Sequence, residues 1–198
     1  MCPLTSSEQA KKIQHKSKSQ IIETMRAEHD EKKLPLSMTI HKKTPEEVFQ
    51  LLKLPENLPY FFENLSKTEF VSENKNKWFF DANEESPEAF DFVMQSEFDE
   101  NSPALLWRSE DGAGFDYSVA IELERAQANR GTIARMTVVY DNKAGKFASL
   151  FEKFMGKDAE TVSRKILGRI KAFCETGSVP TTKGQPSGRA EDLPQLKH

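Results

Sequence analysis

Residues 104–124 read ALLWRSEDGAGFDYSVAIELE, and the apolar pattern of this stretch decides the fold. After DGAG at 111–114, the large apolar residues fall on every second position from Phe115 to Leu123, and Asp116 and Glu122 fall between them. A period of two indicates a strand with one apolar and one polar face. DGAG predicts a turn, so the stretch predicts an antiparallel hairpin. The apolar face of this hairpin must either pack against a core or line a cavity.

The same alternation recurs on both sides of this hairpin. Further strands are predicted at LPLSMTIHK (34–42), KTEFVSE (67–73), NKWFFDAN (76–83), AFDFVMQSEF (89–98) and GTIARMTVVY (131–140). A turn is predicted at Asn74–Asn76 between the second and the third of these segments. The repeated alternation predicts a single antiparallel sheet, which must cover its apolar face.

Helical signals flank the strands. Thr44, Pro45 and Glu47 form a strong helix start for TPEEVFQLL (44–52), and PENLPYFFENL (55–65) predicts a second short helix. From Lys146 to Thr176 the apolar residues change to helical spacing, with a break indicated at 156–158, and Gly177 predicts the end of this helix. The long terminal helix is the expected cover of the sheet.

This order predicts an α+β fold in which a curved antiparallel sheet of about six to seven strands surrounds a long C-terminal helix. Two short helices follow the first strand. The folded domain is expected over residues 34–176. Residues 1–33 form a polar N-terminal segment that is compatible with a helix over 7–32, and residues 177–198 have the composition of a disordered tail.

Composition limits the classes of function. The 198 residues are 37% hydrophobic and 30% charged, with a net charge of -3, so no overall positive field favours nucleic acid. No apolar run approaches the roughly 20 residues of a membrane span, and the N-terminus lacks the apolar centre of a secretory signal. Only a weak basic cluster in the N-terminal segment suggests transient membrane contact. Cys2 and Cys174 are far apart, which predicts reduced thiols and a cytoplasmic protein.

The sequence offers little catalytic chemistry. The four histidines, His15, His29, His41 and His198, do not have the spacing of metal ligands, and no cofactor motif is present, so neither a metal nor a cofactor is expected. The strand carboxylates occupy the polar phase and are expected on a solvated face: Asp91, Glu97, Asp116 and Glu122. Arg108 is expected to face water or to pair with a carboxylate of a neighbouring strand.

The order of elements resembles the helix-grip fold of the START and birch-pollen-allergen superfamily. More narrowly, it resembles the bacterial polyketide cyclase/dehydrase and lipid-transport (SRPBCC) branch. The resemblance rests on TPEEVFQLLKLPENLPYFFENL (44–65), ALLWRSEDGAGFDYSVAIELE (104–124), RGTIARMTVVYDNKAGK (130–146) and GRIKAFCETGSVPTTKGQPSGR (168–189). Relatives often carry Trp where this chain has Met94. The resemblance implies a cavity between the sheet and the last helix.

Aromatic and methionine side chains dominate the face that such a cavity would use. The expected lining residues are Trp78, Phe80, Phe92, Met94, Trp107, Tyr117, Val119, Met136, Tyr140, Phe151, Phe154 and Met155. The hydroxyls of Tyr117 and Tyr140 are expected either to hold a ligand oxygen or to bond to backbone groups.

The leading hypothesis is the binding or transport of an apolar or amphipathic small molecule, such as a lipid, an isoprenoid quinone or a polyketide. Two alternatives stay open. One is a cyclase, aromatase or dehydratase acting on a polyketide-like substrate, which needs an acid or base in the cavity. The other is a protein-interaction module with a filled core and an unknown protein partner.

Overall fold

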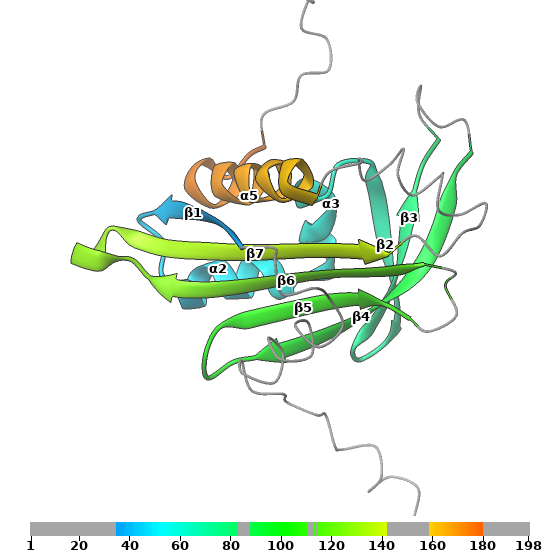
Figure 1. The fold of residues 1–198 in the computed structure, drawn as a ribbon, viewed down its shortest axis with the longest axis horizontal. Coiled ribbons are helices and arrows are strands. Elements are labelled where there is room, and N and C mark those ends of the chain that lie inside the picture. The colour runs from blue at the N-terminus through cyan, green and yellow to red at the C-terminus, as the bar shows by residue number, and fades with distance from the viewer. Residues whose placement is uncertain (1–34, 83–87, 111–112, 114, 142–158, 180–198) are drawn as a thin grey trace, which may run out of the picture.

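Seven strands form one antiparallel sheet in the computed structural model, which describes residues 35–82, 88–110, 113, 115–141 and 159–179 (Figure 1). The order across the sheet is β1-β7-β6-β5-β4-β3-β2, so the first strand pairs with the last. The strands are β1 (Leu36–His41), β2 (Leu65–Ser72), β3 (Lys75–Phe80), β4 (Phe90–Asp99), β5 (Ala104–Ser109), β6 (Asp116–Arg125) and β7 (Gly131–Asp141). This is the α+β architecture that the sequence predicted.

The hairpin at residues 104–124 is confirmed as β5 and β6. Trp107 pairs with Val119 and Leu105 pairs with Ile121, so the predicted apolar residues lie on one face. Ser109 closes the hairpin, because its hydroxyl accepts a hydrogen bond from the Tyr117 amide at 3.0 Å and donates one to the Phe115 carbonyl at 3.1 Å.

The helices between β1 and β2 are α2 (Pro45–Lys53), the short 3-10 helix η2 (Pro55–Asn57) and α3 (Leu58–Phe61). The predicted start of α2 is confirmed as a capping box. The Thr44 hydroxyl accepts from the Glu47 amide at 3.2 Å, and the Glu47 carboxylate accepts from the Thr44 amide at 2.8 Å. The second predicted helix forms as the two short pieces η2 and α3. A further short 3-10 helix, η3 (Gln127–Asn129), connects β6 to β7.

The last helix, α5 (Ala159–Thr176), packs against β1 and β7 (Figure 1). Lys171 Nζ donates to the Thr39 carbonyl at 2.7 Å, and the Glu175 carboxylate accepts from the His41 amide at 2.7 Å, which fastens the end of the helix to β1. Gly177 ends the helix as predicted, with a φ of 75° and an amide bonded to the Phe173 carbonyl. The predicted helical stretch at 146–158 lies outside the described residues.

One hydrophobic core joins the inner face of the sheet to α2, α3 and α5. We call this inner side of the sheet the concave face. On the opposite side, Leu106 and Ala120 form a small second cluster with Val139. The carboxylate of Glu97 also lies on this outer face, but the expectation that it is solvated is wrong, since the residue is only 7% exposed. A guanidinium nitrogen of Arg108, on the neighbouring strand, lies 3.5 Å from the Glu97 Oε1 atom. Pairing with a carboxylate of a neighbouring strand was one of the two expectations for Arg108.

Within the described ranges, no helix combines the length and apolar character needed to cross a membrane. Cys174 is a free cysteine that is buried in the core. Cys2 and the whole N-terminal segment lie outside the described residues, as does most of the tail.

Candidate functional site

The predicted lining residues that the structure describes all belong to the core on the concave face. Eight of these are buried and Tyr140 is half-buried: Trp78 and Phe80 on β3, Phe92 and Met94 on β4, Trp107 on β5, Tyr117 and Val119 on β6, and Met136 on β7. Phe151, Phe154 and Met155 lie outside the described residues. The structure therefore brings the strand members together, and their role as the lining of a cavity stays a prediction.

Aromatic rings make up much of this face. The ring centroids of Phe62 and Trp78 are 4.7 Å apart, and those of Phe62 and Trp107 are 6.0 Å apart. Phe92 stacks on Phe80 at 5.5 Å. Sequence reasoning did not include Phe62, which follows α3 and carries no strand periodicity. Its place in the aromatic run PYFF was the available signal.

Two of the groups that could move protons on the concave face, Tyr117 and Cys174, are held neutral. Burial raises the pKa of the Tyr117 hydroxyl far above its usual range, so this phenol stays protonated at neutral pH. Burial also raises the pKa of the Cys174 thiol to about 11. The carboxylates from the polar phase lie on the outer face, where Asp91 pairs with Lys77 at 2.7 Å. The described concave face thus offers hydrogen bonds rather than a general base.

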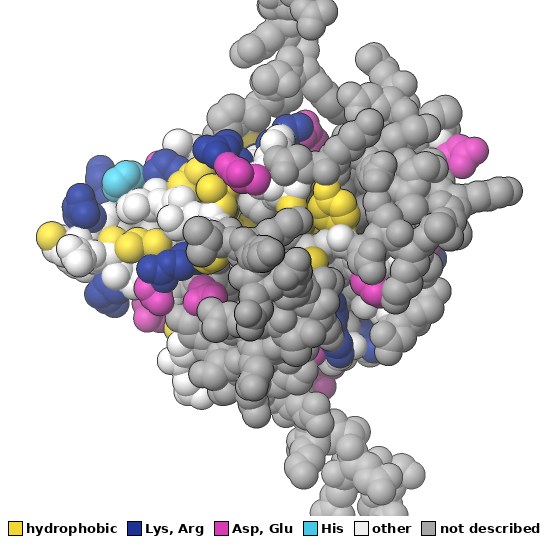
Figure 2. All heavy atoms as spheres, viewed as in Figure 1, with side chains coloured by type: hydrophobic (Ala, Val, Ile, Leu, Met, Phe, Trp, Pro, Cys, Tyr) yellow, Lys and Arg dark blue, Asp and Glu magenta, His cyan; other side chains and the backbone are white. Residues whose placement is uncertain are grey.

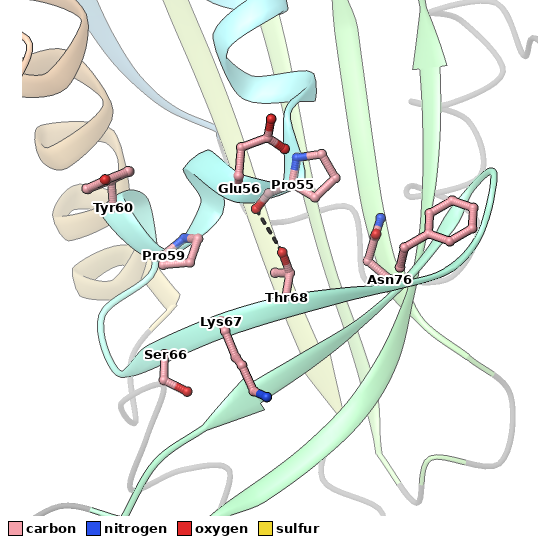
Figure 3. A pocket seen from close by; sticks show the side chains of 9 residues that line it. Pro55, Glu56, Pro59, Tyr60, Ser66, Lys67, Thr68 and Asn76 are labelled. Carbon is pink, nitrogen blue, oxygen red and sulfur yellow. Dashed lines mark hydrogen bonds between the residues drawn. The ribbon is translucent and has the colours of Figure 1, made fainter.

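An open groove of about 790 Å³ lies at the edge of this face, between the η2–α3 segment and the strands β2 and β3 (Figure 3). It is lined by Pro55, Glu56, Pro59, Tyr60, Ser66, Lys67, Thr68, Phe70 and Asn76. None of the cavity-lining residues that were predicted from the sequence lines this groove. We call this feature the edge groove.

Hydrogen bonds and ring contacts hold the two walls of the edge groove in place. The Thr68 hydroxyl on β2 donates to the Pro55 carbonyl at 3.0 Å, and Figure 3 shows this bond joining the walls. Tyr60 is positioned by α5, because its carbonyl accepts from Arg169 Nε at 2.8 Å and its ring stacks on Phe173 at 5.1 Å. The groove is therefore built from fixed elements.

Phe70 is an apolar residue whose side chain lies on the concave face of the sheet but is exposed to solvent. It pairs with Asn76 across the β2–β3 ladder, and paired residues share a face of the sheet. Asn76 and Trp78, the nearby inward residues of β3, are buried, yet Phe70 is 77% exposed. The edge groove thus places an exposed aromatic ring beside the buried core.

Asn76 contributes a polar group to this apolar surface. The residue is 7% exposed and lines the groove, and its side-chain amide makes no hydrogen bond to the described part of the chain. The sequence placed Asn76 both at the end of a turn and at the start of the strand predicted at 76–83, and since β3 begins at Lys75, Asn76 is a strand residue. Counting back by two from Trp78 would have put it on the concave face.

Charged groups around the molecule are mixed in sign. Figure 2 shows acidic and basic side chains close together at the end where β1 and the connection between β6 and β7 lie. Ion pairs at this end include Lys43 with Glu47 at 3.5 Å. Among the described residues, no group of three His, Cys, Asp or Glu side chains could hold a metal ion.

No protein-family model and no curated protein matches the chain. Solved structures do. A protein from Deinococcus radiodurans is 21% identical, with a TM-score of 0.54, over 72% of this chain and 96% of that one. The Zhui aromatase/cyclase from Streptomyces sp. R1128 is 11% identical, with a TM-score of 0.53, over 74% of this chain and 98% of that one.

The third structure, the di-domain aromatase/cyclase StfQ from the steffimycin biosynthetic pathway, is 15% identical, with a TM-score of 0.53. The match covers 72% of this chain and 45% of StfQ. At these identities the likeness concerns the fold and not the activity. The chain has the helix-grip fold that its sequence predicted.

Proposed function

We propose that the protein binds an apolar or amphipathic small molecule on its concave face, and that the molecule enters through the edge groove. Suitable chemical classes are a lipid, an isoprenoid quinone or a polyketide. The observation that carries this proposal is Phe70, an inward-facing aromatic side chain that is 77% exposed in a groove of about 790 Å³. Small-molecule sites are concave and mostly apolar, with few polar groups.

Binding is favoured over catalysis by the chemistry of the described face. A cyclase or dehydratase of the kind named among the similar folds would need an acid or base near the substrate. Here burial raises the pKa of the Tyr117 phenol, which keeps its proton and cannot serve as a base at neutral pH, and Asp91 and Glu97 lie on the outer face in ion pairs. Binding of an apolar ligand needs no catalytic group, because each Å² of apolar surface that is removed from water contributes about 25 cal/mol of favourable free energy.

The first test is native mass spectrometry of the protein as purified from cells, followed by organic extraction. We expect a retained molecule of defined mass that is recovered in the organic phase. The second test is titration of the extracted molecule, or of a long-chain fatty alcohol, while the tryptophan fluorescence is recorded. The chain has two tryptophans, Trp78 and Trp107, and both lie on the concave face. A clean protein mass together with unchanged emission would contradict the proposal.

A matched pair of variants tests the route of entry. Phe70→Ser should weaken binding several-fold and leave the melting temperature unchanged, because the ring is exposed in the free protein. Val71→Ser is the control, since Val71 is also exposed (50%) and is not among the lining residues of the groove. Equal affinities for the two variants would place the binding surface elsewhere.

A further inference from the structure

We propose that Asn76 is the polar anchor of the edge groove and selects neutral ligands that carry a carbonyl or hydroxyl oxygen beside a flat apolar body. This inference rests on the proposed function and specifies which apolar molecules the site prefers. Among the described lining residues, Ser66 and Thr68 have their hydroxyl protons engaged by backbone carbonyls, and the remaining hydroxyl belongs to Tyr60, which is 50% exposed.

The burial of Asn76 is the first step of the argument. Asn76 is 7% exposed as a whole residue, it lines the groove, and no hydrogen bond joins its amide to a described residue. Buried polar side chains usually have a hydrogen-bond partner, so an amide of this kind calls for a ligand or a water molecule. The amide supplies two donors and one acceptor oxygen, which fit a ketone, a quinone carbonyl or an alcohol.

The direction of the side chain is the second step. Figure 3 shows the Asn76 amide pointing into the space between β3 and the η2 segment, toward the wall that carries Pro55 and Glu56. The Thr68 hydroxyl on the adjacent strand already donates to the Pro55 carbonyl. Its proton is therefore engaged, and the donor that remains for a ligand is the Asn76 amide.

The surroundings define the rest of the ligand. Tyr60, Phe70 and two prolines provide flat apolar contact surface along the groove. Lys67 lines the outer rim, where its ammonium group pairs with Glu69 at 2.6 Å and lies 4.5 Å from the Phe79 ring centroid. Because this cation is already paired, no free positive charge is directed at the floor of the groove. A neutral oxygen suits the site better than a carboxylate or phosphate.

A pair of probes isolates the role of Asn76. The first probe is 2-acetylnaphthalene and the second is 2-ethylnaphthalene, which has nearly the same shape but no oxygen. We expect the wild-type protein to bind the ketone about fivefold more tightly after correction for the difference in water solubility, as suits one neutral hydrogen bond. Asn76→Leu should remove this preference and leave the affinity for the hydrocarbon within twofold.

Controls separate this proposal from the proposed function. Asn74→Leu makes the same chemical change in the neighbouring turn and should retain the preference, since Asn74 is not a lining residue. Asn76→Ala also removes the amide and serves as a second variant if the leucine variant does not fold. Equal binding of both probes by the wild type, or a preference that survives in Asn76→Leu or Asn76→Ala, would overturn the role of Asn76 alone. Failure of both probes to bind would overturn the groove as a site as well.

Discussion

Thr132 is the point at which the sheet holds the start of α2, and its replacement by valine gives a quantitative test of this structure. The residue is fully buried at the beginning of β7, and its hydroxyl donates a 2.7 Å hydrogen bond to the Lys43 carbonyl. Lys43 immediately precedes the Thr44 cap of α2. Valine has nearly the same shape as threonine, so Thr132→Val removes the bond without opening a cavity.

The expected loss follows from the two groups involved. Deleting the donor leaves the half-buried Lys43 carbonyl without this partner, which costs about 2 kcal/mol of unfolding free energy. For a chain of this size, such a loss lowers the melting temperature by about 4 to 8 °C. Thr132→Ser is the matched control, because it retains the hydroxyl and loses one buried methyl group, at a cost of about 1 kcal/mol.

Urea unfolding, followed by circular dichroism and by tryptophan fluorescence, measures both variants. The valine variant should be less stable than the serine variant, although valine is the more hydrophobic residue. If Thr132→Val were as stable as the wild type, the hydrogen bond would contribute nothing and the anchoring of α2 by β7 would have to be explained by packing alone.

Three further predictions concern backbone, charge and thiol chemistry. Gly131→Ala should lower the unfolding free energy by at least about 2 kcal/mol in urea, since φ is +134° and a Cβ would lie 2.1 Å from the Ile40 carbonyl oxygen. Glu175→Gln should lower stability modestly at pH 7: partial burial alone would raise the Glu175 pKa, but hydrogen bonds from Lys171 and the His41 amide lower it overall. The stabilising effect of this carboxylate is therefore complete above its ordinary pKa of 4.5 and fades as pH falls through the lowered value, so the two proteins should converge in acid and differ constantly above about pH 5. In a Cys2→Ser background, Cys174 should resist a thiol reagent at pH 8 until urea unfolds the protein, because it is 4% exposed and its pKa is about 11; rapid labelling of the native protein would contradict its burial.

The parts of the fold that could be predicted from the sequence are those determined by residues close together in the chain. Period-two alternation in β6 needs only the geometry of a strand, and Thr44 with Glu47 needs only the first turn of a helix. Both features follow from residues that lie within a few positions of one another. The packing of α5 on β1 was predicted only as a general cover for the sheet. The specific bonds from Lys171 to Thr39 and from His41 to Glu175 join distant segments and leave no local pattern.

The surface properties of individual residues were harder to predict, because exposure depends on what covers a strand. Glu97 follows the polar phase of β4, as expected, but its neighbours across the sheet include Leu106, and the residue is nearly buried. Phe70 is the converse case, an apolar-phase residue that remains exposed. Alternation shows which face a side chain occupies, and it does not show whether another element lies over that face.

The exposure of Phe70 follows from the position of β2 at the edge of the sheet. β2 has only β3 as a neighbour, and η2 and α3 cover its first half, where Leu65 is buried and Thr68 bonds to Pro55. Beyond that point no described helix covers the inner side of the strand, so Phe70 is exposed and the largely buried Asn76 lies at the edge groove. The ring contacts among Phe62, Trp78 and Phe92 fill the described core next to this opening. In the proposed function, the ligand meets the concave face first at the edge groove, and any deeper position requires these rings to move.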